Sequence, residues 1–341
     1  MKAVPFFEHG PLDVLQYRED FPDPIAGKND VVIDIEYCGV NHLDIWTRQG
    51  IAGKKKIKLP HICGCDIVGT VRKAHSFKVG ERVMVYPGVS CGKCQQCKSG
   101  RENLCSQFAI IGGMSDWNGG YAEQTAVPAR NAVRLPESMK DEVAATFAVS
   151  YLTAWNMLQM NGAGKGKTVL VYGAASGVGM ATIQLAKALG ATVITTVSSS
   201  EKRGFAKKVG VDHVIDRTNQ DIAGEARKIT HGKGVDIVID HVGAATWQTS
   251  IAALKQGGRM AVCGMTSGNE ATVPVRTFYT KQIAMTGALL GTRAQLLELV
   301  NFISRKKIQP VIDSVFSLRD AREAQKKMEA DLHAGKILLR C

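Results

Sequence analysis

Short apolar runs alternate with amphipathic segments through the middle of the chain. The run Thr168–Tyr172 is followed by a glycine-rich turn and then by residues 180–189, in which apolar positions recur with a helical period before Gly190. The next apolar run, Ala191–Val197, begins directly after that glycine. This order predicts a strand, a tight turn, a helix and a second strand.

The same alternation continues to about residue 264. Runs rich in β-branched residues lie within 214–216, 235–243 and 258–264, and most of them end in Gly or Asp. Buried parallel strands have this composition, and their carboxyl ends meet at the edge of the sheet where ligands bind. We therefore predict an α/β fold with a doubly wound parallel sheet.

The turn after the first strand reads Gly173-Ala-Ala-Ser-Gly177-Val-Gly179. Glycines permit a tight turn and allow a pyrophosphate to approach the N-terminus of the following helix, where free N–H groups and the helix dipole favour an anion. Because a strand precedes the turn and a helix and strand follow it, the motif predicts a dinucleotide-binding (Rossmann) loop rather than a simple glycine-rich loop.

The end of the second strand indicates which dinucleotide is bound. An NAD site usually has an acidic residue there to hold the ribose hydroxyls. Here the strand runs into Ser198-Ser-Ser-Glu-Lys-Arg203, whose hydroxyls and two cations suit the 2′-phosphate of NADP. The pattern favours NADP(H), while the nearby Glu201 keeps NAD open as the alternative.

Four of the nine cysteines form a C-x2-C-x2-C-x7-C array, made of Cys91, Cys94, Cys97 and Cys105. Zinc prefers four thiolates in a tetrahedron, and close-set cysteines in a polar, glycine-containing loop can surround one ion. With four sulfur ligands the ion has no open position, so we expect one structural zinc per chain in the lobe 91–105. Two disulfides would need an oxidising compartment, for which the sequence gives no signal.

Length and composition set the broad class. A chain of 341 residues is longer than one ordinary core supports, which predicts two domains, and 45% hydrophobic with 22% charged residues is typical of a compact globular protein. Pro5 and Glu8 interrupt any secretory apolar segment, and no run approaches the roughly 18 apolar residues of a membrane span. We expect a cytoplasmic protein without a membrane partner.

The net charge of +12 does not by itself indicate a nucleic-acid partner. The positive residues are spread along the chain and no nucleic-acid-binding motif accompanies them. The densest cluster, Lys54-Lys55-Lys56 with Lys58, is typical of a solvated loop. An alternative interpretation is attraction of an anionic substrate such as an acyl-coenzyme A.

Further motifs carry a resemblance over nearly the whole chain. They are Gly39-Val-Asn-His-Leu-Asp44, Gly64-Cys-Asp-Ile-Val-Gly69, Gly119-Gly-Tyr-Ala-Glu123 and Gly335-Lys-Ile-Leu-Leu339, together with the cysteine lobe and the glycine loop. With these, the chain resembles the medium-chain dehydrogenase/reductase superfamily, which includes zinc alcohol dehydrogenases and zinc-independent quinone oxidoreductases. The resemblance implies a β-rich GroES-like catalytic domain at 1–150 and 289–341 and an NADP-binding Rossmann domain at 151–288.

The chain departs from the zinc alcohol dehydrogenases at the catalytic metal. Where those enzymes have a cysteine, a His-Glu pair and a second cysteine, this sequence has Asn41, Cys65-Asp66 and Val149. Asn and Val are poor zinc ligands, so we expect the catalytic zinc to be absent. A variant metal site built from Cys65 and Asp66 with His42, or with Cys63 or Cys38, is the alternative.

The quinone oxidoreductase branch has the same asparagine and a similar glycine loop. By that resemblance Asn41 and Trp46 line the nicotinamide pocket, and Lys202 and Arg217 face the 2′-phosphate. Without zinc, negative charge on a substrate oxygen needs other donors. The catalytic candidates are Asn41, His42, Trp46, Cys65, Asp66, Tyr151 and Thr153. The cofactor candidates are Gly173, Ala175, Ser176, Gly177, Val178, Gly179, Ser198, Ser199, Lys202, Arg217, His241, Val242, Gly264 and Leu289.

These observations predict an NADP(H)-dependent oxidoreductase that transfers hydride between the nicotinamide and a carbonyl, quinone or enone. The alternatives are a zinc alcohol dehydrogenase with a variant metal site, an acyl-CoA ene reductase, and a non-enzymatic nucleotide-binding protein. The apolar run 283–290 lies, by the resemblance, near a sheet edge that forms dimers, which predicts a homodimer or homotetramer.

Overall fold

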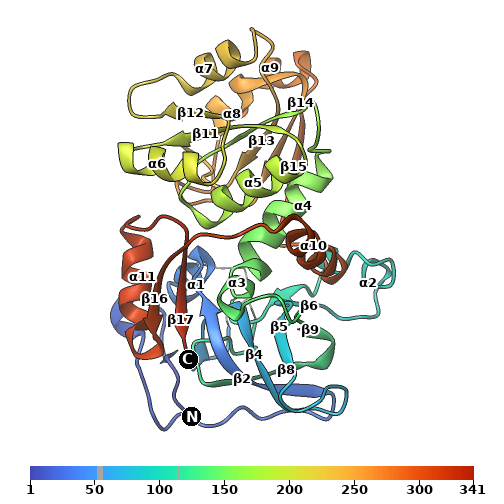
Figure 1. Cartoon of the computed structure of the whole chain (residues 1–341), viewed down its shortest axis with the longest axis vertical. Coiled ribbons are helices and arrows are strands. Elements are labelled where there is room, and N and C mark those ends of the chain that lie inside the picture. The colour runs from blue at the N-terminus through green and yellow to red at the C-terminus, as the bar shows by residue number, and fades with distance from the viewer. Residues whose placement is uncertain (52–56, 114) are drawn as a thin grey trace. The chain divides into compact units, whose positions relative to one another are not determined.

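The computed structural model describes residues 1–51, 57–113 and 115–341, and Lys54, Lys55 and Lys56 of the predicted lysine loop lie outside these ranges. The chain forms two compact units (Figure 1). Unit 1 consists of Met1–Ser150 and Thr292–Cys341, and unit 2 of Tyr151–Gly291. The chain passes from one unit to the other between residues 150 and 151 and between residues 291 and 292.

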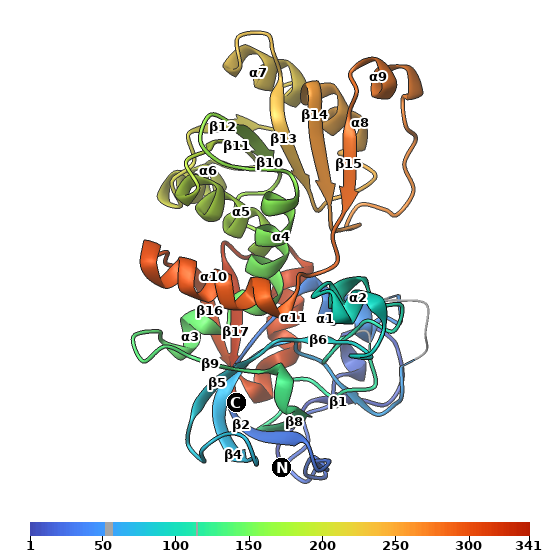
Figure 2. The ribbon, with the colours of Figure 1, turned by 90° about the vertical axis from the view of Figure 1, so that its right-hand side faces the viewer.

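Unit 2 is built on one parallel sheet with the strand order β12-β11-β10-β13-β14-β15. Figure 2 shows β13, β14 and β15 side by side, with β15 at the edge. The strands are β10 (Thr168–Val171), β11 (Thr192–Val197), β12 (His213–Asp216), β13 (Val235–Asp240), β14 (Leu254–Val262) and β15 (Ala284–Gly287). The helices are α4 (Leu152–Met160), α5 (Gly177–Ala188), α6 (Ser200–Lys208), α7 (Ile222–Ile229), α8 (Trp247–Ala253) and α9 (Val275–Thr280). The predicted α/β fold with a doubly wound parallel sheet is confirmed.

The first βα unit forms where the sequence predicts it, because its apolar residues fit a buried strand. Val169, Leu170 and Val171 of β10 are all fully buried. The helix begins earlier than the apolar period indicates, at Gly177 instead of residue 180. The Ser176 hydroxyl caps this helix by accepting a hydrogen bond from the Gly179 N–H at 3.0 Å, which places the last glycines inside the first helical turn.

Unit 1 is the predicted β-rich unit. Its main sheet has the order β16-β17-β2-β4-β5-β9, and β8 also pairs with β2. These strands are β2 (Asp30–Gly39), β4 (Asp66–Lys73), β5 (Arg82–Val85), β8 (Gln124–Pro128), β9 (Ala132–Arg134), β16 (Ile312–Ser317) and β17 (Lys336–Arg340). Shorter pairs are β1 (Pro5–Phe6) with β3 (His61–Ile62) and β6 (Gly88–Val89) with β7 (Ala109–Ile110). The α-helices are α1 (His42–Arg48), α2 (Gln95–Lys98), α3 (Asp141–Ala144), α10 (Arg293–Lys306) and α11 (Ala321–Glu329).

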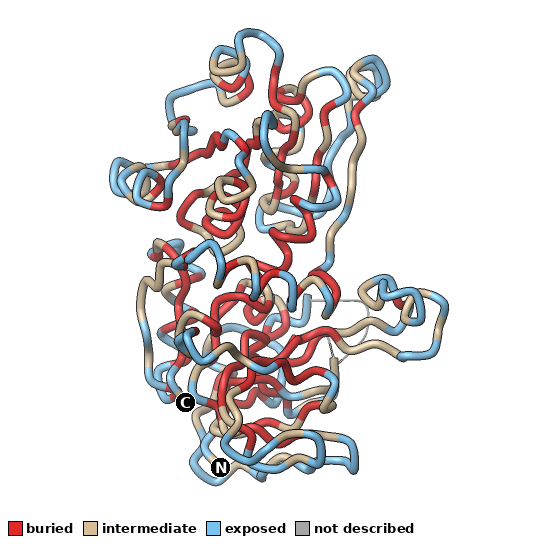
Figure 3. The backbone as a smooth tube through the Cα atoms, turned by 45° about the vertical axis from the view of Figure 1, so that its right-hand side comes forward, coloured by how far each residue is buried: buried red, intermediate tan, exposed pale blue. Residues whose placement is uncertain are grey.

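Most residues of β2 and β4, the central strands of unit 1, are buried. Figure 3 shows buried residues gathered in the interior of this unit. Three strands of this unit meet at one point. In the antiparallel register, Gly39 at the end of β2 pairs with Asp66 at the start of β4 and with Leu338 in the middle of β17. The chain leaves β2 through Val40 and Asn41 into α1. The register therefore places residues from three distant stretches of sequence at the N-terminus of α1.

The apolar run predicted to lie at a sheet edge contains β15, which is the edge strand of the parallel sheet. Leu289, just beyond this strand, exposes 47% of its surface. Within the described ranges no helix has the length and apolar character needed to cross a membrane.

Candidate functional site

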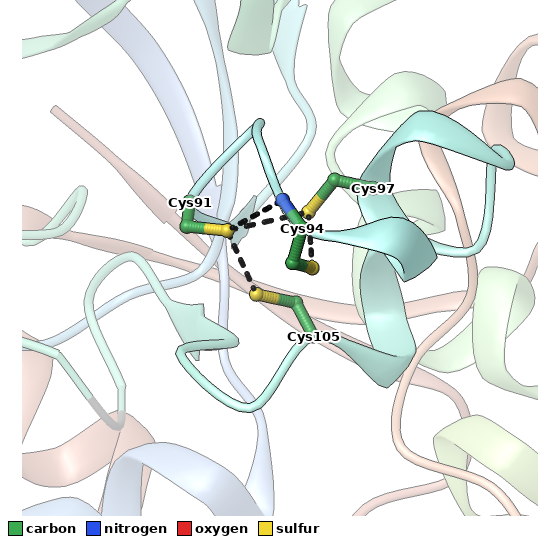
Figure 4. Close-up of side chains that lie close together, drawn as sticks. All are labelled: Cys91, Cys94, Cys97 and Cys105. Carbon is green, nitrogen blue, oxygen red and sulfur yellow. Dashed lines mark hydrogen bonds between the residues drawn. The ribbon is translucent and has the colours of Figure 1, made fainter.

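The cysteine lobe brings its four sulfur atoms together (Figure 4). The Sγ atoms of Cys91 and Cys97 are 3.8 Å apart, and those of Cys94 and Cys105 lie 3.5 Å from the sulfurs of Cys97 and Cys91, respectively. A tetrahedral zinc ion with Zn–S bonds of about 2.3 Å requires sulfur spacings of roughly 3.8 Å. A disulfide would need about 2.0 Å, so the geometry fits a metal ion and no disulfide joins these four residues.

Local backbone structure explains this arrangement. The antiparallel pair β6–β7 closes the base of the lobe, and α2 begins directly after Cys94. The N–H of Cys94 donates to the Cys91 sulfur at 3.4 Å, and hydrogen bonds from the N–H groups of Lys93 and Cys94 lower the pKa of the Cys91 thiol to about 6. Such bonds favour the thiolate that a zinc ligand must be.

A second polar cluster lies at the junction of β2, β4 and β17. The Asp66 carboxylate is fully buried and accepts three hydrogen bonds. The Val149 N–H donates to Oδ1 at 2.7 Å, and the Asn41 amide and the Lys336 ammonium each donate to Oδ2 at 2.9 Å. Both oxygens of this carboxylate are therefore occupied by protein donors.

Asn41 and Lys336 are also bound to each other. The Lys336 ammonium donates to Asn41 Oδ1 at 2.8 Å and to the Val40 carbonyl at 3.0 Å. The Asn41 amide donates its hydrogens to Asp66 and to the Gly39 carbonyl, the latter at 3.3 Å. Donation from Asn41 to a substrate oxygen, as predicted from the sequence, would require one of these bonds to be released.

The residues at the positions of catalytic zinc ligands do not fit a zinc ion. Asp66 is paired with an ammonium, Asn41 is bound through both polar atoms, and Val149 contributes its N–H, which is a donor and not a ligand. Cys65 is fully buried, with its sulfur 3.8 Å from Asp44 Oδ1. Within residues 1–51, 57–113 and 115–341, the only convergent group of three or more potential metal ligands is the cysteine lobe. The alternative set of Cys65, Asp66 and His42 is not brought together.

Asp44 connects α1 to the motif that contains Cys65. Its carboxylate accepts from the Asn41 N–H at 2.8 Å and from the Tyr121 hydroxyl at 3.0 Å. Burial raises the pKa of Asp44 to about 7, although these hydrogen bonds act in the opposite direction. The Cys63 thiol lies 3.5 Å from the Asp44 carbonyl. The start of α1 is thus fixed from two sides, by Asp44 within the helix and by Lys336 from β17.

His42 is the first residue of α1 and Trp46 lies one turn further, with the two ring centroids 6.2 Å apart. Both side chains are half-buried. Burial lowers the pKa of His42, and the charge of Lys336 acts in the same direction, while Asp331 and Glu329 oppose it. A neutral imidazole near pH 7 can donate one hydrogen bond and accept another.

In unit 2 the glycine loop follows β10 at the carboxyl edge of the parallel sheet. Gly173 has φ of +60°, a conformation that glycine adopts without strain. Gly179 has no room for a side chain, since a Cβ there would lie 2.1 Å from the Gly173 carbonyl. Ser176 donates to the same carbonyl at 2.9 Å and lies 3.0 Å from His241 Nε2. This cradle, at the N-terminus of the twelve-residue α5, fits a dinucleotide pyrophosphate.

The other predicted cofactor residues follow neighbouring strands at the same sheet edge. The register aligns Val197 with Asp216 and Asp240 with Val262, so these four strands end together. The segments directly beyond these ends contain the predicted residues Ser198, Ser199, Arg217, His241, Val242 and Gly264. The strand order reverses between β10 and β13, which is where ligands bind in open parallel sheets.

The segment that follows β11 carries hydroxyls and cations. Ser199 caps α6 by accepting from the Lys202 N–H at 3.2 Å. Lys202 is half-buried and Arg217 is exposed. An acidic group is also present, since Asp216 lies 4.0 Å from Arg203 and accepts from the Thr218 N–H at 3.0 Å. Asp216 ends the neighbouring strand β12, and Ser198 stands directly after β11, where an NAD site has its acidic residue.

Tyr151 and Thr153 belong to unit 2, near and within α4, and both are buried. The Tyr151 hydroxyl donates to Gln184 on α5. The remaining catalytic candidates all belong to unit 1. The roles of Tyr151 and Thr153 toward a substrate stay predictions.

Comparison with known proteins gives the family. The alcohol dehydrogenase GroES-like domain family matches residues 27–137, and the zinc-binding dehydrogenase family matches residues 177–305. The NAD-dependent alcohol dehydrogenase of Sulfolobus acidocaldarius is 30% identical, with 100% of this chain and 99% of the relative covered. The acryloyl-coenzyme A reductase of Sulfurisphaera tokodaii is 30% identical, with coverage of 94% and 95%. A crystal structure of an NAD-dependent alcohol dehydrogenase superposes with a TM-score of 0.94 at 36% identity and covers 100% of both chains.

The chain therefore belongs to the medium-chain dehydrogenase/reductase superfamily, with the GroES-like and zinc-binding dehydrogenase domains of the alcohol dehydrogenases. It is an oxidoreductase of that type. The resemblance predicted from the sequence motifs is confirmed.

Sequence reasoning missed Lys336 as a site residue. The tail Gly335-Lys-Ile-Leu-Leu contributes to the resemblance, which assigns no role to its lysine. In the structure only 2% of the Lys336 side chain is exposed, and this residue completes the Asn41–Asp66 cluster. A lysine in an otherwise apolar strand sequence is a signal that could have indicated a buried partner of opposite charge, since lysine is rarely buried alone. Asp44 and Tyr121 were also missed, although both lie within quoted motifs.

Proposed function

We propose that this protein is an NADP(H)-dependent oxidoreductase that transfers hydride between the nicotinamide and a carbonyl, quinone or enone without a catalytic zinc ion. The observation that carries the proposal is the buried Asn41–Asp66–Lys336 cluster. Asn41 and Val149 stand at ligand positions without offering a thiolate, imidazole or carboxylate, and the Asp66 carboxylate is neutralised by an ammonium within hydrogen-bond distance. We further propose that the cysteine lobe holds one structural zinc ion per chain, because its four sulfurs leave no coordination position open.

The preference for NADP(H) is supported by the segment after β11. Ser198 and Ser199 stand where an NAD enzyme has an acidic residue, and Lys202 and Arg217 supply positive charge to the same end of the sheet. A 2′-phosphate gains charge-assisted hydrogen bonds from such groups. Relatives named as NAD-dependent make NAD the competing cofactor.

Catalysis would then depend on orientation and on neutral donors. When bound, the dinucleotide supplies or accepts the hydride. The chain's own contributions are the α5 N-terminus, which holds the pyrophosphate, and His42, whose lowered pKa leaves a neutral imidazole that can donate to a substrate oxygen. Thr153 is the other proposed donor. Tyr151 is fully buried and gives its one hydroxyl hydrogen to Gln184, so it could donate to a substrate only after that bond is released. Quinones and conjugated enones spread the developing charge, so they need less electrophilic assistance than a simple ketone.

A second candidate is reduction of the double bond of an enoyl-coenzyme A. The similarity to an acryloyl-coenzyme A reductase favours it, and the net charge of +12 would attract an anionic thioester. We also propose a homodimer or homotetramer, because β15 leaves an unpaired edge on the parallel sheet.

A substrate screen tests the function directly. NADPH oxidation should be measured with quinones, conjugated enones, aryl ketones, an enoyl-coenzyme A and a simple aliphatic ketone, alongside the zinc content of the pure protein. We expect turnover with activated acceptors, little with the aliphatic ketone, and one zinc per chain. Two zinc ions per chain would contradict the proposal that hydride transfer needs no catalytic zinc. No NADPH oxidation with any acceptor would favour a nucleotide-binding protein that is not an enzyme.

The cofactor assignment has its own test in the variants Lys202→Ala and Arg217→Ala. Each should weaken NADPH by about tenfold or more and leave NADH nearly unchanged, because a charged hydrogen bond contributes roughly 1.5–3 kcal/mol and only NADPH has the 2′-phosphate. Lys207→Ala is the matched control, since it removes an exposed cation from the same helix α6. The measurement is the Kd of both cofactors by fluorescence titration. An equal loss for NADH and NADPH would contradict the assignment.

A further inference from the structure

Three oxygen atoms converge on the Lys336 ammonium inside unit 1. They are the Val40 carbonyl at 3.0 Å, Asn41 Oδ1 at 2.8 Å and Asp66 Oδ2 at 2.9 Å. An ammonium has three hydrogens to donate, so these acceptors satisfy it completely. With 2% of the lysine side chain and none of the aspartate exposed, the pair is shielded from water.

We propose that Val40 O, Asn41 Oδ1 and Asp66 Oδ2 form a built cation site that the chain fills with its own Lys336 ammonium, which thereby serves as a positioning residue for the N-terminus of α1. A carbonyl, an amide oxygen and a carboxylate are hard oxygen donors, and one of them carries a full negative charge. The site recognises a primary ammonium by charge and by three directed hydrogen bonds. Without zinc at this place, the internal cation supplies the positive charge that Asp66 requires.

Asn41 links Lys336 to the proposed donor His42. The residue precedes His42, and Lys336 fixes the Asn41 side chain while Asp44 holds its N–H. Loss of the ammonium leaves Asp66 buried without its countercharge and releases the oxygen of Asn41. His42 and the start of α1 then lose one of the two supports that orient them toward a substrate.

Chemical rescue tests this proposal. Lys336→Ala removes four atoms that propylammonium can replace, because this ion carries the same three carbons and the ammonium. The full chain with its zinc should be compared in the presence of propylammonium, tetramethylammonium and 1-propanol, at equal ionic strength. We expect Lys336→Ala to lower kcat by about 10- to 100-fold, by analogy with the loss when the outer-shell partners that orient metal ligands are removed. Propylammonium should restore part of kcat and raise the unfolding temperature, whereas the other two additives should do neither.

Two further variants separate a cation site from a general effect of amines. Lys336→Met fills much of the space without the charge, and it should not respond to propylammonium. Asp66→Asn in the Lys336→Ala background removes the negative charge and should abolish the response. If Lys336→Ala does not fold alone, the yield of folded chain on refolding with each additive provides the same comparison.

The measurement of kcat rests on the proposed reductase activity. The measurement of the unfolding temperature does not, because it needs no substrate. Rescue of stability by propylammonium, together with no measurable turnover by the unaltered chain, would support the cation site and contradict the proposed function. An equal response to propylammonium and 1-propanol, or no response to propylammonium in folded Lys336→Ala, would overturn the cation site.

Discussion

Replacing Cys94 with Ser is expected to reduce the zinc content from one ion per chain to nearly none and to lower the stability of unit 1 by several kcal/mol. Cys94 lies 3.5 Å from the Cys97 sulfur and also positions α2, which begins at the next residue. Structural zinc in small peptides contributes about 10–16 kcal/mol of apparent binding free energy, so the removal of one ligand is expected to cost several kcal/mol. Of its four cysteines only Cys105 is buried.

The chemical step of folded Cys94→Ser protein should be nearly unchanged, because the four sulfurs leave no coordination position for a substrate. Zinc is measured by elemental analysis, stability by thermal unfolding, and the hydride step by single-turnover oxidation of NADPH. Cys341→Ser is the control, since this thiol belongs to the same unit 1 and lies outside the zinc lobe. Loss of the hydride step with zinc retained would show that the lobe is not purely structural.

The parts of the molecule that the sequence predicts well are those determined by local chemistry. The cysteine lobe needs only close-set thiols in a polar loop, and its four residues meet within one short segment. The βα unit from β10 to α5 needs only an apolar run, a glycine turn and a capping serine. In both cases the residues that determine the structure are neighbours in sequence, so no knowledge of the sheet register is needed.

The Asn41–Asp66–Lys336 cluster could not be derived in this way. Its members come from β2–α1, β4 and β17, and they meet because the antiparallel register pairs Gly39 with both Asp66 and Leu338. A shift of one residue in either pairing would turn the side chains to the other face of the sheet. The resemblance puts Asn41 and Asp66 at positions of the catalytic zinc ligands of alcohol dehydrogenases, but it gives no reason to expect an ammonium between them.

This cluster also changes the interpretation of Asn41. From sequence alone its amide is a candidate donor to a substrate oxygen. In the structure both hydrogens go to protein acceptors and the oxygen goes to Lys336, which makes the residue part of a support rather than an exposed donor. Among the unit 1 candidates, we therefore propose His42 as the side chain that meets a substrate, because it is half-buried and its pKa is lowered from the ordinary value.

The Gly179→Ala variant should lose most of its affinity for NADPH and NADH alike. A Cβ at this position would lie 2.1 Å from the Gly173 carbonyl and 2.8 Å from the Ser176 hydroxyl, so either the loop or the first turn of α5 must move. Overpacking of this kind costs about 1–3 kcal/mol, and here the displaced atoms are those proposed to hold the pyrophosphate.

A loss of about 1–3 kcal/mol of binding free energy corresponds to a roughly 5- to 150-fold rise in Kd for both cofactors. Gly204→Ala is the matched control, because Gly204 lies within α6 of the same unit and a Cβ there meets no atom within 4 Å. That substitution should leave binding unchanged and stabilise the helix slightly, by up to about 1 kcal/mol.

Isothermal titration with both cofactors measures the change in Kd, and it also separates the two ends of the proposed cofactor site. Lys202→Ala should affect NADPH alone, whereas Gly179→Ala should affect NADH equally, since the pyrophosphate is common to both. Normal NADPH affinity in a folded Gly179→Ala chain would mean that the glycine loop does not hold the pyrophosphate.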